Sequence, residues 1–462
     1  ITLHAGIVNQ GPDGQFAYTV SNAAYQANFS KRAVGSTEEL PGAHLRILDA
    51  NHNELTSWIS NGTAHEVTGI LTPNADYYFE ETGAPDGYTV TTSFAFHLDN
   101  DMVPSVQNVS MGGTDKNVVY MEDAATTVSV SKRILNTATE LPGAILSITP
   151  TTAAAGFTNT FSWTSGSDGK DENGNLNPHI LKGLLVGTTY TLSETPPDGY
   201  IPVPKVDFTV DQYGVVSTKL STQDTSAYQP TAESKLVVLY NTPVTVTFSK
   251  TALVGSDELP GAKLALYKGD GTDTSAANTV DSWTSGSDGT DGSGKLNPHV
   301  LTGQLTVGET YTLTETTAPN GYAVTESVSF TVLANGAIQA VGTSPELTAV
   351  SDHGVTMKDK PLSLTVSKTT LNGTDLPGAT LTLTDVTDGK TVATWTGLTS
   401  GSKTFSSSIA LNEGAYVYTY PEGQTYPLIG GHAYELKETL PPTGYMLAET
   451  MTCTLGTDGV IR

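Results

Sequence analysis

The chain repeats one pattern four times, and this repetition limits what it can fold into. In each copy a short alternating run ends in Ser-Lys, and a Leu-Pro-Gly-Ala motif follows. A tryptophan and an aromatic-led run into a Gly-Tyr turn complete the common part. Self-similarity of this kind indicates domains in tandem. The ELPGA or DLPGA motifs lie at 39–43, 140–144, 258–262 and 375–379, and the aromatic-led runs at 77–88, 190–200, 311–322 and 434–445.

Between these markers, apolar and polar residues alternate over short runs such as TVSVSK and TVTFSK, with Gly, Asp and Asn at the breaks. Such alternation is typical of strands with one buried face, and no helical period persists. Turn signals about every ten residues favour antiparallel sheets packed as sandwiches. We therefore expect an all-β protein with one tryptophan per copy between the sheets, namely Trp58, Trp163, Trp283 and Trp395.

We place domain boundaries after the short apolar strand that closes each of the first three copies. This strand reads VVYMED at 118–123, VVLYN at 237–241 and VTMKD at 355–359. Residues 1–22 then read as the closing strand or strands of a preceding or neighbouring domain. The predicted domains, called repeats one to four below, are 23–123, 124–241, 242–359 and 360–462, and the fourth lacks its last strand.

The charge balance excludes some classes of partner. There are 22 basic and 47 acidic residues, a net charge of −25, which disfavours nucleic acid and anionic membranes. Cys453 is the one cysteine, so no disulfide forms within the chain. No apolar run approaches the roughly 20 residues of a membrane span, and the N-terminus lacks a leader pattern. We expect a processed or excised segment of a secreted protein, with no membrane insertion in this segment.

Each copy places polar groups in strands that are otherwise apolar. A lysine ends the first strand, a glutamate lies in the aromatic-led strand, and an Asp or Asn ends the closing strand. Such groups could form a plain ionic cluster, but burial of charge often fails to stabilise a protein. The lysines are Lys31, Lys132, Lys250 and Lys368, the glutamates are Glu81, Glu194, Glu315 and Glu438, and the closing residues are Asp123, Asn241 and Asp359.

Burial suggests a chemical role for these groups. In an apolar core the pKa of a lysine falls and that of a carboxyl rises, so a neutral amine can face a neutral acid or an amide. The amine is then a nucleophile toward the side-chain carbonyl of Asp or Asn, and the glutamate can relay protons. The product is an isopeptide bond, formed once per domain without turnover. It would take the place of the missing disulfides.

The residues quoted above resemble the CnaB-type (SpaA-like) domains of Gram-positive pilins and surface adhesins. The resemblance rests on the lysine before ELPGA, the E-box of the YTLxETxAPxGY type and the closing Asn or Asp, and it covers essentially the whole chain. It implies tandem immunoglobulin-like (CnaB-type) β-sandwich domains in series on the cell surface. It also implies a self-forming isopeptide bond in each domain with the E-box glutamate as catalyst.

A constant spacing assigns the bond partners. Each closing residue lies nine residues before the next lysine, which pairs Lys31 with Asp123, Lys132 with Asn241 and Lys250 with Asp359. Asn22 stands nine residues before Lys31, and repeat four has Lys368 and Glu438 but no closing residue. We therefore expect residues 1–22 to complete repeat four of a neighbouring, identical subunit by strand addition, with Lys368 bonded to Asn22 head to tail. The rival interpretation is one period of a giant tandem-repeat polypeptide.

Several other motifs have plainer interpretations. LPPTG at 440–444 matches a sortase signal but lies inside the E-box turn, and the loop at 167–175 lacks the last ligand of a calcium loop. His179 and His299 lie in matching NPH sequences without a second metal ligand nearby, and Cys453 reads as a small buried apolar residue. We expect no metal and no cofactor.

These features favour a structural subunit of an extracellular pilus or surface fibre. The alternative is the stalk or ligand-binding region of a cell-surface adhesin, with a host or microbial surface ligand as partner. A binding domain would need a long insertion or an exposed aromatic patch in one copy, and none has one. An enzyme with turnover is not indicated, because the glutamates fall one per repeat at structural positions.

Overall fold

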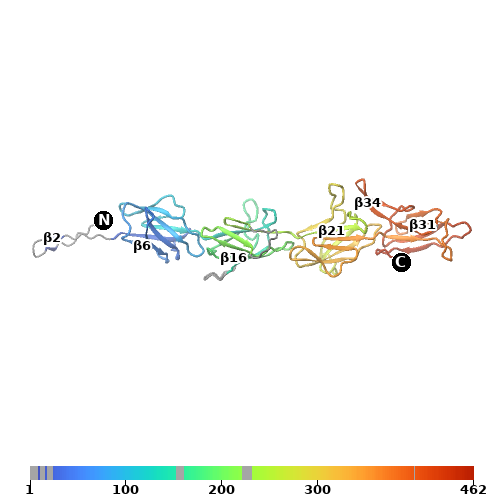
Figure 1. Cartoon of the computed structure of the whole chain (residues 1–462), viewed down its shortest axis with the longest axis horizontal. Coiled ribbons are helices and arrows are strands. Elements are labelled where there is room, and N and C mark those ends of the chain that lie inside the picture. The colour runs from blue at the N-terminus through green and yellow to red at the C-terminus, as the bar shows by residue number, and fades with distance from the viewer. Residues whose placement is uncertain (1–8, 11–15, 18–23, 152–160, 221–230, 400) are drawn as a thin grey trace. The chain divides into compact units, whose positions relative to one another are not determined.

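The computed structural model describes residues 9–10, 16–17, 24–151, 161–220, 231–399 and 401–462. Every regular element within these ranges is a strand (Figure 1), so the predicted all-β class is confirmed. Internal contacts divide the chain into two compact units, Ile1–Pro197 with Val203–Asn241 and Asp198–Pro202 with Thr242–Arg462. The described part contains no helix that is long and apolar enough to span a membrane.

The first unit contains two sandwiches and a separate short pair, β1 (Asn9–Gln10) with β2 (Phe16–Ala17). Repeat one has a four-stranded sheet and a five-stranded sheet. In order across the sheet, the first contains β10 (Gly112–Asp115), β11 (Val118–Asp123), β3 (Gln26–Ala33) and β6 (His65–Thr68). The second contains β5 (Glu54–Ile59), β4 (His44–Asp49), β7 (Ala75–Gly83), β8 (Phe94–Leu98) and β9 (Pro104–Val106). Repeat two also has two sheets. The four-stranded sheet contains, in order, β15 (His179–Lys182), β12 (Thr127–Ile134), β20 (Leu236–Asn241) and β19 (Thr231–Glu233). The five-stranded sheet contains β14 (Phe161–Thr164), β13 (Ile145–Pro150), β16 (Thr189–Thr195), β17 (Val206–Val210) and β18 (Val216–Leu220).

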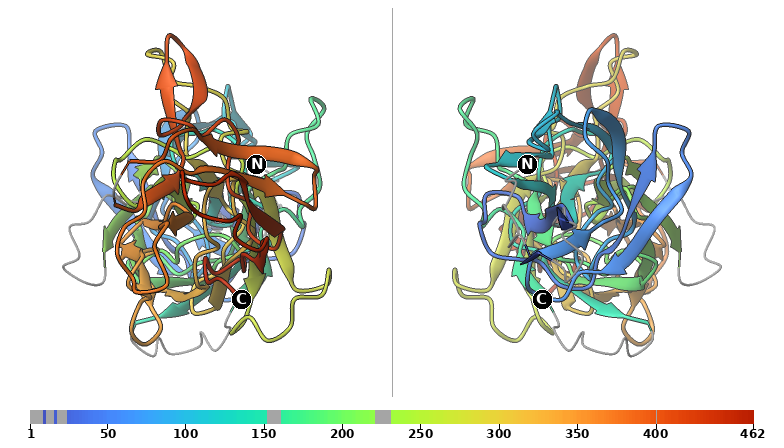
Figure 2. Two further views of the ribbon diagram at one scale, coloured as in Figure 1. Left: turned by 90° about the vertical axis from the view of Figure 1, so that its right-hand side faces the viewer. Right: turned by 90° about the vertical axis from the view of Figure 1, so that its left-hand side faces the viewer.

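The second unit contains repeats three and four. In repeat three, the four-stranded sheet contains, in order, β24 (His299–Thr302), β21 (Thr245–Ala252), β29 (Gly354–Asp359) and β28 (Thr348–Ser351). The five-stranded sheet contains β23 (Thr279–Thr284), β22 (Lys263–Lys268), β25 (Thr310–Thr317), β26 (Val328–Val332) and β27 (Ile338–Ala340). Repeat four has one four-stranded sheet, β32 (Lys390–Trp395), β31 (Thr380–Asp385), β36 (Ala433–Leu440), β37 (Met451–Thr454). It adds the pair β30 (Ser363–Val366) and β33 (Lys403–Ser406) and the hairpin β34 (Ser408–Asn412) and β35 (Ala415–Thr419), which extends away from the sheet (Figure 2).

The first and last strands of repeats one to three lie side by side and run parallel, as in β3 with β11. This corrects the expectation of purely antiparallel sheets. Parallel neighbours need a long connection, and here the rest of the sandwich supplies it. The arrangement brings the start and the end of each repeat into adjacent positions in one sheet.

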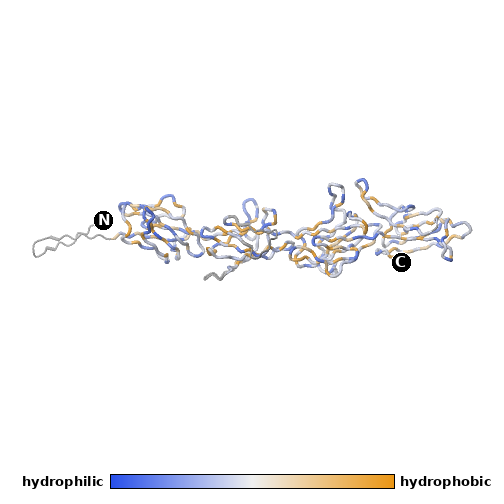
Figure 3. The backbone as a smooth tube through the Cα atoms, in the orientation of Figure 1, coloured by the Kyte–Doolittle hydropathy of each residue, from blue (hydrophilic) through white to orange (hydrophobic). Residues whose placement is uncertain are grey.

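Several core strands bury every second side chain, as their sequence alternation predicts, among them β7, β11, β17 and β26. Hydrophobic and hydrophilic residues alternate along much of the tube in Figure 3. In β3 the buried row is Ala27, Phe29 and Lys31. In β11 it ends at Asp123, and in β7 it ends at Glu81. The same two-residue period that buries the apolar side chains therefore carries a charged group into the end of each row.

The tryptophans lie at the cores with an aromatic partner. Trp163 and Trp395 are buried, whereas Trp58 and Trp283 are partly buried against their clusters. His65, His179 and His299 stack on the tryptophans of repeats one to three at ring centroid distances of 4.2, 4.4 and 4.2 Å. Stacking thus accounts for the NPH histidines, which also bond Asp168 and Asp288 through Nδ1.

The ELPGA motif does more than turn the chain. Gly261 has a φ of 97°, as the Pro-Gly turn predicts. The preceding Glu258 is buried, and its carboxyl accepts hydrogen bonds from the Lys250 backbone N–H (3.0 Å) and Ser249 Oγ (2.8 Å). Glu39 and Glu140 bond the equivalent lysine N–H groups. The glutamate therefore fixes the strand segment that carries the buried lysine.

This burial generates a prediction about pH. Burial raises the pKa of Glu258 to about 7 from 4.5. Between pH 4.5 and about 7, Glu258 is protonated in the folded chain and ionised in the unfolded chain. Its contribution to the free energy of unfolding is therefore complete below pH 4.5 and is lost as the pH rises through about 7. We expect Glu258→Gln to abolish this dependence, worth about 2 to 3 kcal/mol in the unfolding free energy of repeat three.

Native-state hydrogen exchange of repeat three at pH 5 and pH 8 measures this free energy. Glu309→Gln, at a glutamate whose side chain is 44% exposed, is the matched control. An identical pH dependence in Glu258→Gln and in the unsubstituted chain would contradict the prediction.

Candidate functional site

In repeat one, the structure brings the three predicted groups together at the end of the core. Lys31 Nζ lies 3.0 Å from Glu81 Oε1, and it contacts Asp123 Oδ1 directly. All three side chains are 0% exposed. Lys31 comes from the first strand, Asp123 from the last, and Glu81 from the opposite sheet. The site therefore joins both sheets and both ends of the repeat.

Repeat three has the same arrangement. Lys250 Nζ lies 2.9 Å from Glu315 Oε2 and contacts Asp359 Oδ1, and these side chains are also 0% exposed. The strand registers agree with those of repeat one, since Lys250 pairs with Met357 as Lys31 does with Met121. The geometry is thus a property of the repeated fold.

Repeat two places an amide in the position of the acid. Lys132 Nζ lies 3.0 Å from Glu194 Oε2, and Asn241 Nδ2 donates a hydrogen bond of 2.8 Å to Glu194 Oε1. One carboxyl group therefore contacts both the amine and the amide nitrogen.

The shortened aromatic-led run of repeat two leaves its glutamate in place. Glu81, Glu315 and Glu438 pair with a leucine next to a β-bulge, where one extra residue follows the glutamate. Glu194 pairs with Leu146 in the same way, but without a bulge. The missing residue is the bulge residue, and its loss does not shift the glutamate.

Repeat four holds two of its predicted groups together. Lys368 Nζ lies 3.2 Å from Glu438 Oε1, and the Lys368 side chain is 16% exposed. Lys368 follows β30 instead of lying within it, which differs from the other lysines. Asn22, the predicted third group, lies outside the described residues.

The buried groups favour neutral forms. Burial raises the pKa of Glu81 and of Glu315 to about 7, against the opposing effect of the adjacent lysines and with a further increase from Asp123 and Asp359. Burial also lowers the pKa of Lys132, although Glu194 acts in the opposite direction. A core that disfavours charge is the condition under which a lysine amine becomes nucleophilic.

Two of the sites include a threonine that was not predicted from the sequence. The Thr91 N–H donates to Glu81 Oε2 at 2.7 Å, and Thr91 Oγ1 lies 2.7 Å from Asp123 Oδ1. Thr325 makes the same contacts with Glu315 and Asp359, at 2.7 and 2.7 Å. The signal was available, because both threonines are the third residue after the tyrosine of the Gly-Tyr turn.

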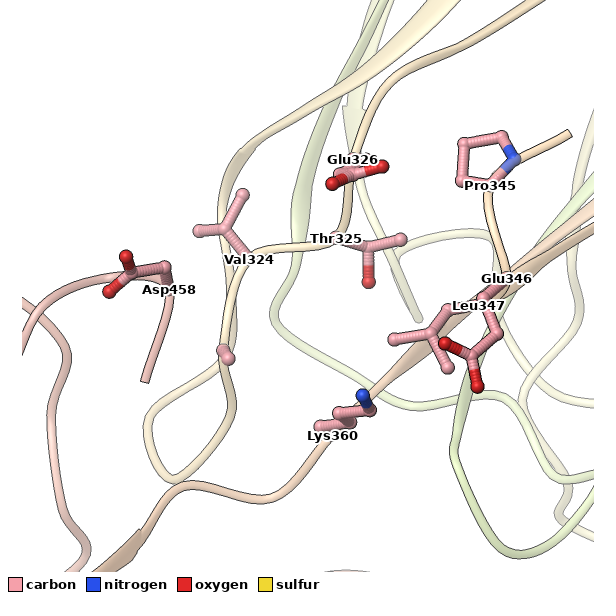
Figure 4. A pocket seen from close by; sticks show the side chains of 9 residues that line it. Val324, Thr325, Glu326, Pro345, Glu346, Leu347, Lys360 and Asp458 are labelled. Atoms are coloured by element: carbon pink, nitrogen blue, oxygen red, sulfur yellow. The ribbon is translucent and has the colours of Figure 1, made fainter. Parts of the chain in front are cut away.

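A surface pocket adjoins the site of repeat three (Figure 4). Its lining includes Val324, Thr325, Glu326 and Lys360. Thr325 lines this pocket and also contacts Asp359. One side chain thus connects the solvent-facing pocket with the buried carboxyl group.

Three groups that could hold a metal ion lie in repeat four. Asp385, Asp388 and His432 have ligand atoms within 4.8 Å of one another. Asp385 is buried and already accepts hydrogen bonds from the N–H groups of Thr387 and Asp388, and it bonds His432 Nδ1 at 2.8 Å. These contacts explain the cluster as a turn that is fixed by its own side chains.

The remaining motifs have structural positions. The loop at 167–175 is held by Asp171, which accepts from the N–H groups of Asn173 and Asn175. LPPTG begins at the end of β36 and continues into the turn. Cys453 is partly buried against the core of repeat four, so it is less enclosed than the sequence suggested.

The chain was compared with known proteins. The "SpaA: Prealbumin-like fold domain" family matches residues 26–110 and 244–345, in repeats one and three. The curated proteins contain no sequence match. The matched solved structures include the C-terminal fragment of the pilus adhesin SpaC from Lactobacillus rhamnosus GG. That match has 17% identity and a TM-score of 0.28, and it covers 47% of this chain and 98% of that chain.

Two further solved structures are matched. The Bacillus anthracis TIE protein has 16% identity over 94% of this chain and 73% of its own, with a TM-score of 0.28. A streptococcal ancillary pilin has 15% identity over 73% of this chain and 99% of its own, with a TM-score of 0.23. The chain therefore consists of tandem prealbumin-like sandwiches, and the SpaA domain family, which its sequence resembles, matches those of repeats one and three.

Proposed function

We propose that the chain is a structural subunit of an extracellular pilus or surface fibre whose repeats are stabilised by self-formed isopeptide bonds. The observation that carries the proposal is the buried meeting of a lysine amine, a glutamate and a closing Asp or Asn in repeats one to three. Such groups are costly to bury unless they are neutral or react. The closing strand lies beside the first strand, so a bond between them spans the repeat.

In repeats one and three the reaction is a condensation. The neutral Nζ of Lys31 attacks Cγ of the neutral Asp123 carboxyl group, and the C–N bond forms. Glu81, which is protonated at the start, gives its proton to the departing hydroxyl and takes one from the nitrogen, so the C–O bond breaks and water leaves. Glu81 ends in its initial state, so the reaction occurs once and consumes no cofactor. Lys250, Asp359 and Glu315 act in the same way.

In repeat two the leaving group is ammonia. Nζ of Lys132 attacks Cγ of Asn241, and Glu194 carries a proton from the amine to Nδ2. The two contacts of Glu194, 3.0 Å to the amine and 2.8 Å to the amide nitrogen, suit this relay. The C–N bond to Nδ2 then breaks and the new amide remains.

The bond would restrict the unfolded chain. Lys31 and Asp123 are 92 residues apart, and Lys250 and Asp359 are 109 residues apart. In the chain-entropy account, a cross-link that closes a loop of this length stabilises the fold by up to about 4 to 5 kcal/mol. It also keeps the first and last strands together under load or proteolysis, which suits a surface fibre.

Repeat four supports a link between subunits. Among the described strands, β30 pairs with β33 alone, whereas β3, β12 and β21 each have a partner on both sides. Met446, Leu447 and Met451 are exposed, as expected for a sandwich that lacks a covering strand. An open edge of this kind accepts an added strand. Residues 1–22 of an identical subunit, or the same segment in a tandem polypeptide, would supply it.

The first prediction concerns the three complete repeats. Tryptic peptide mapping of the purified chain should recover cross-linked peptides joining Lys31 to Asp123, Lys132 to Asn241 and Lys250 to Asp359. The first and third should each lack one water, and the second should lack one ammonia. Three unmodified lysines would refute the isopeptide proposal.

Glu315→Ala is the matched variant for this mapping. It removes the proton relay of repeat three and leaves both bond partners, so that repeat should fold without its cross-link while repeats one and two stay linked. A normal bond in the variant would contradict the role of the glutamate.

A second prediction concerns the pH dependence of bond formation. The pKa values of Glu81 and Glu315 are raised to about 7, so these two glutamates are protonated below that pH and ionised above it. Bond formation in repeats one and three should therefore slow as the pH rises through about 7. Unlinked chain recovered in denaturant and refolded by dilution at several pH values, with timed mass analysis, measures the rates. A rate that increases through pH 7 and 8 would be incompatible with this relay.

A third prediction concerns the link between subunits. Denaturing gels of native material should show covalent multimers, and mapping should recover a peptide joining Lys368 to Asn22. Asn22→Ala should remove this species and preserve the three internal bonds. A single band at the 48.3 kDa chain mass, with Lys368 free, would contradict it.

A further inference from the structure

The threonine hydroxyl in repeats one and three separates the two kinds of site. The residue three positions after the turn tyrosine is Thr91 or Thr325 where the closing residue is Asp, and it is Val203 where the closing residue is Asn241. In all three repeats the backbone N–H of this residue donates to the site glutamate. The backbone contact is shared, and the hydroxyl is present in the two sites that close with an Asp and absent from the site that closes with an Asn.

The contacts of the hydroxyl indicate where its proton lies. Thr91 Oγ1 is 2.5 Å from the carbonyl oxygen of Glu122 and 2.7 Å from Asp123 Oδ1. Thr325 Oγ1 is likewise 2.7 Å from the Lys358 carbonyl oxygen and 2.7 Å from Asp359 Oδ1. A carbonyl oxygen only accepts, and a hydroxyl has one proton to donate. The lysine Nζ also contacts this Oδ1, and the arrangement that makes both threonine contacts hydrogen bonds has a proton on Asp Oδ1, which donates it to the threonine.

The other carboxyl oxygen agrees with this assignment. Asp123 Oδ2 and Asp359 Oδ2 are buried and accept no hydrogen bond from an N–H or hydroxyl group among the described residues, although the Asp123 carboxyl group also bonds the Glu81 carboxyl group. An ionised carboxylate would leave a charged oxygen without a donor, which is far more costly than a neutral carbonyl oxygen there. Both observations place the proton on Oδ1 and make Oδ2 the carbonyl oxygen.

We propose that Thr91 and Thr325 hold the reacting aspartic acid in its neutral, electrophilic form, with Oδ1 as the departing hydroxyl. An ionised carboxylate resists attack by an amine, whereas an amide is neutral without help. Repeat two therefore needs no hydroxyl, and Val203 suffices. Repeat four has Ala448 at this position, with its N–H 2.6 Å from Glu438 Oε2. Because alanine has no hydroxyl, the same rule predicts that the bond partner of Lys368 is an asparagine, which agrees with the proposed partner Asn22.

This inference rests on the proposed isopeptide chemistry, and the experiment separates the two. Full-length chain is recovered unlinked in denaturant and refolded, and the bond in each repeat is followed by timed peptide mapping. Thr91→Val should slow bond formation in repeat one about ten-fold, the loss expected for one hydrogen bond. Repeats two and three of the same molecules serve as internal controls for folding and should react at their usual rates.

Four further variants distinguish the hydroxyl chemistry from packing. Thr91→Ser should restore the rate, because serine returns the hydroxyl to the same position. Adding Asp123→Asn to Thr91→Val should restore fast bonding with loss of ammonia. In repeat two, Asn241→Asp should react slowly, and Val203→Thr should rescue it.

The outcomes are distinct. An unchanged rate in Thr91→Val, or a slow reaction in the double variant with asparagine, overturns the role of the threonine and leaves the isopeptide proposal standing. Absence of all three bonds in the unsubstituted chain overturns the proposed function, and this inference with it.

Discussion

The structure depends on how an apolar core accommodates a lysine. Lys31, Lys132 and Lys250 stand at the ends of inward-facing rows of alanine, valine and phenylalanine. An ammonium ion there loses its hydration, and the nearby carboxyl groups can repay that loss only in part. The site therefore favours proton transfer and neutral groups, and neutral amines and acids in contact are reactants. The same burial that makes the cluster costly gives it its proposed chemistry.

The topology makes this chemistry useful. The first and last strands of each complete repeat are parallel neighbours, so a bond between their side chains encloses nearly the whole repeat. The glutamate reaches the site from the opposite sheet, and an ELPGA glutamate fixes the backbone of the lysine strand. Each of repeats one to three therefore carries its own complete set of reacting and supporting groups. A chain with one cysteine can be cross-linked in this way without oxidation.

Much of this could be predicted from the sequence because strands bury every second residue. The alternation placed Lys31, Glu81 and Asp123 on inward faces, and the repetition of the pattern pointed to their meeting. The parallel pairing of first and last strands was not predicted, since alternation carries no information on strand direction. Thr91 was missed because it lies outside the strands, where its contacts depend on the conformation after the turn. Glu258 was read only as part of a turn motif, because its reach back to the lysine strand requires the folded backbone.

The most direct test of the account is an experimental structure of the chain at atomic resolution. The proposal predicts continuous density from Lys31 Nζ to Cγ of Asp123, with a planar amide and a C–N distance of about 1.33 Å. The equivalent bonds should join Lys132 to Asn241 and Lys250 to Asp359. An intact carboxyl group with Nζ at a hydrogen-bond distance of about 2.7 Å or more would contradict the account.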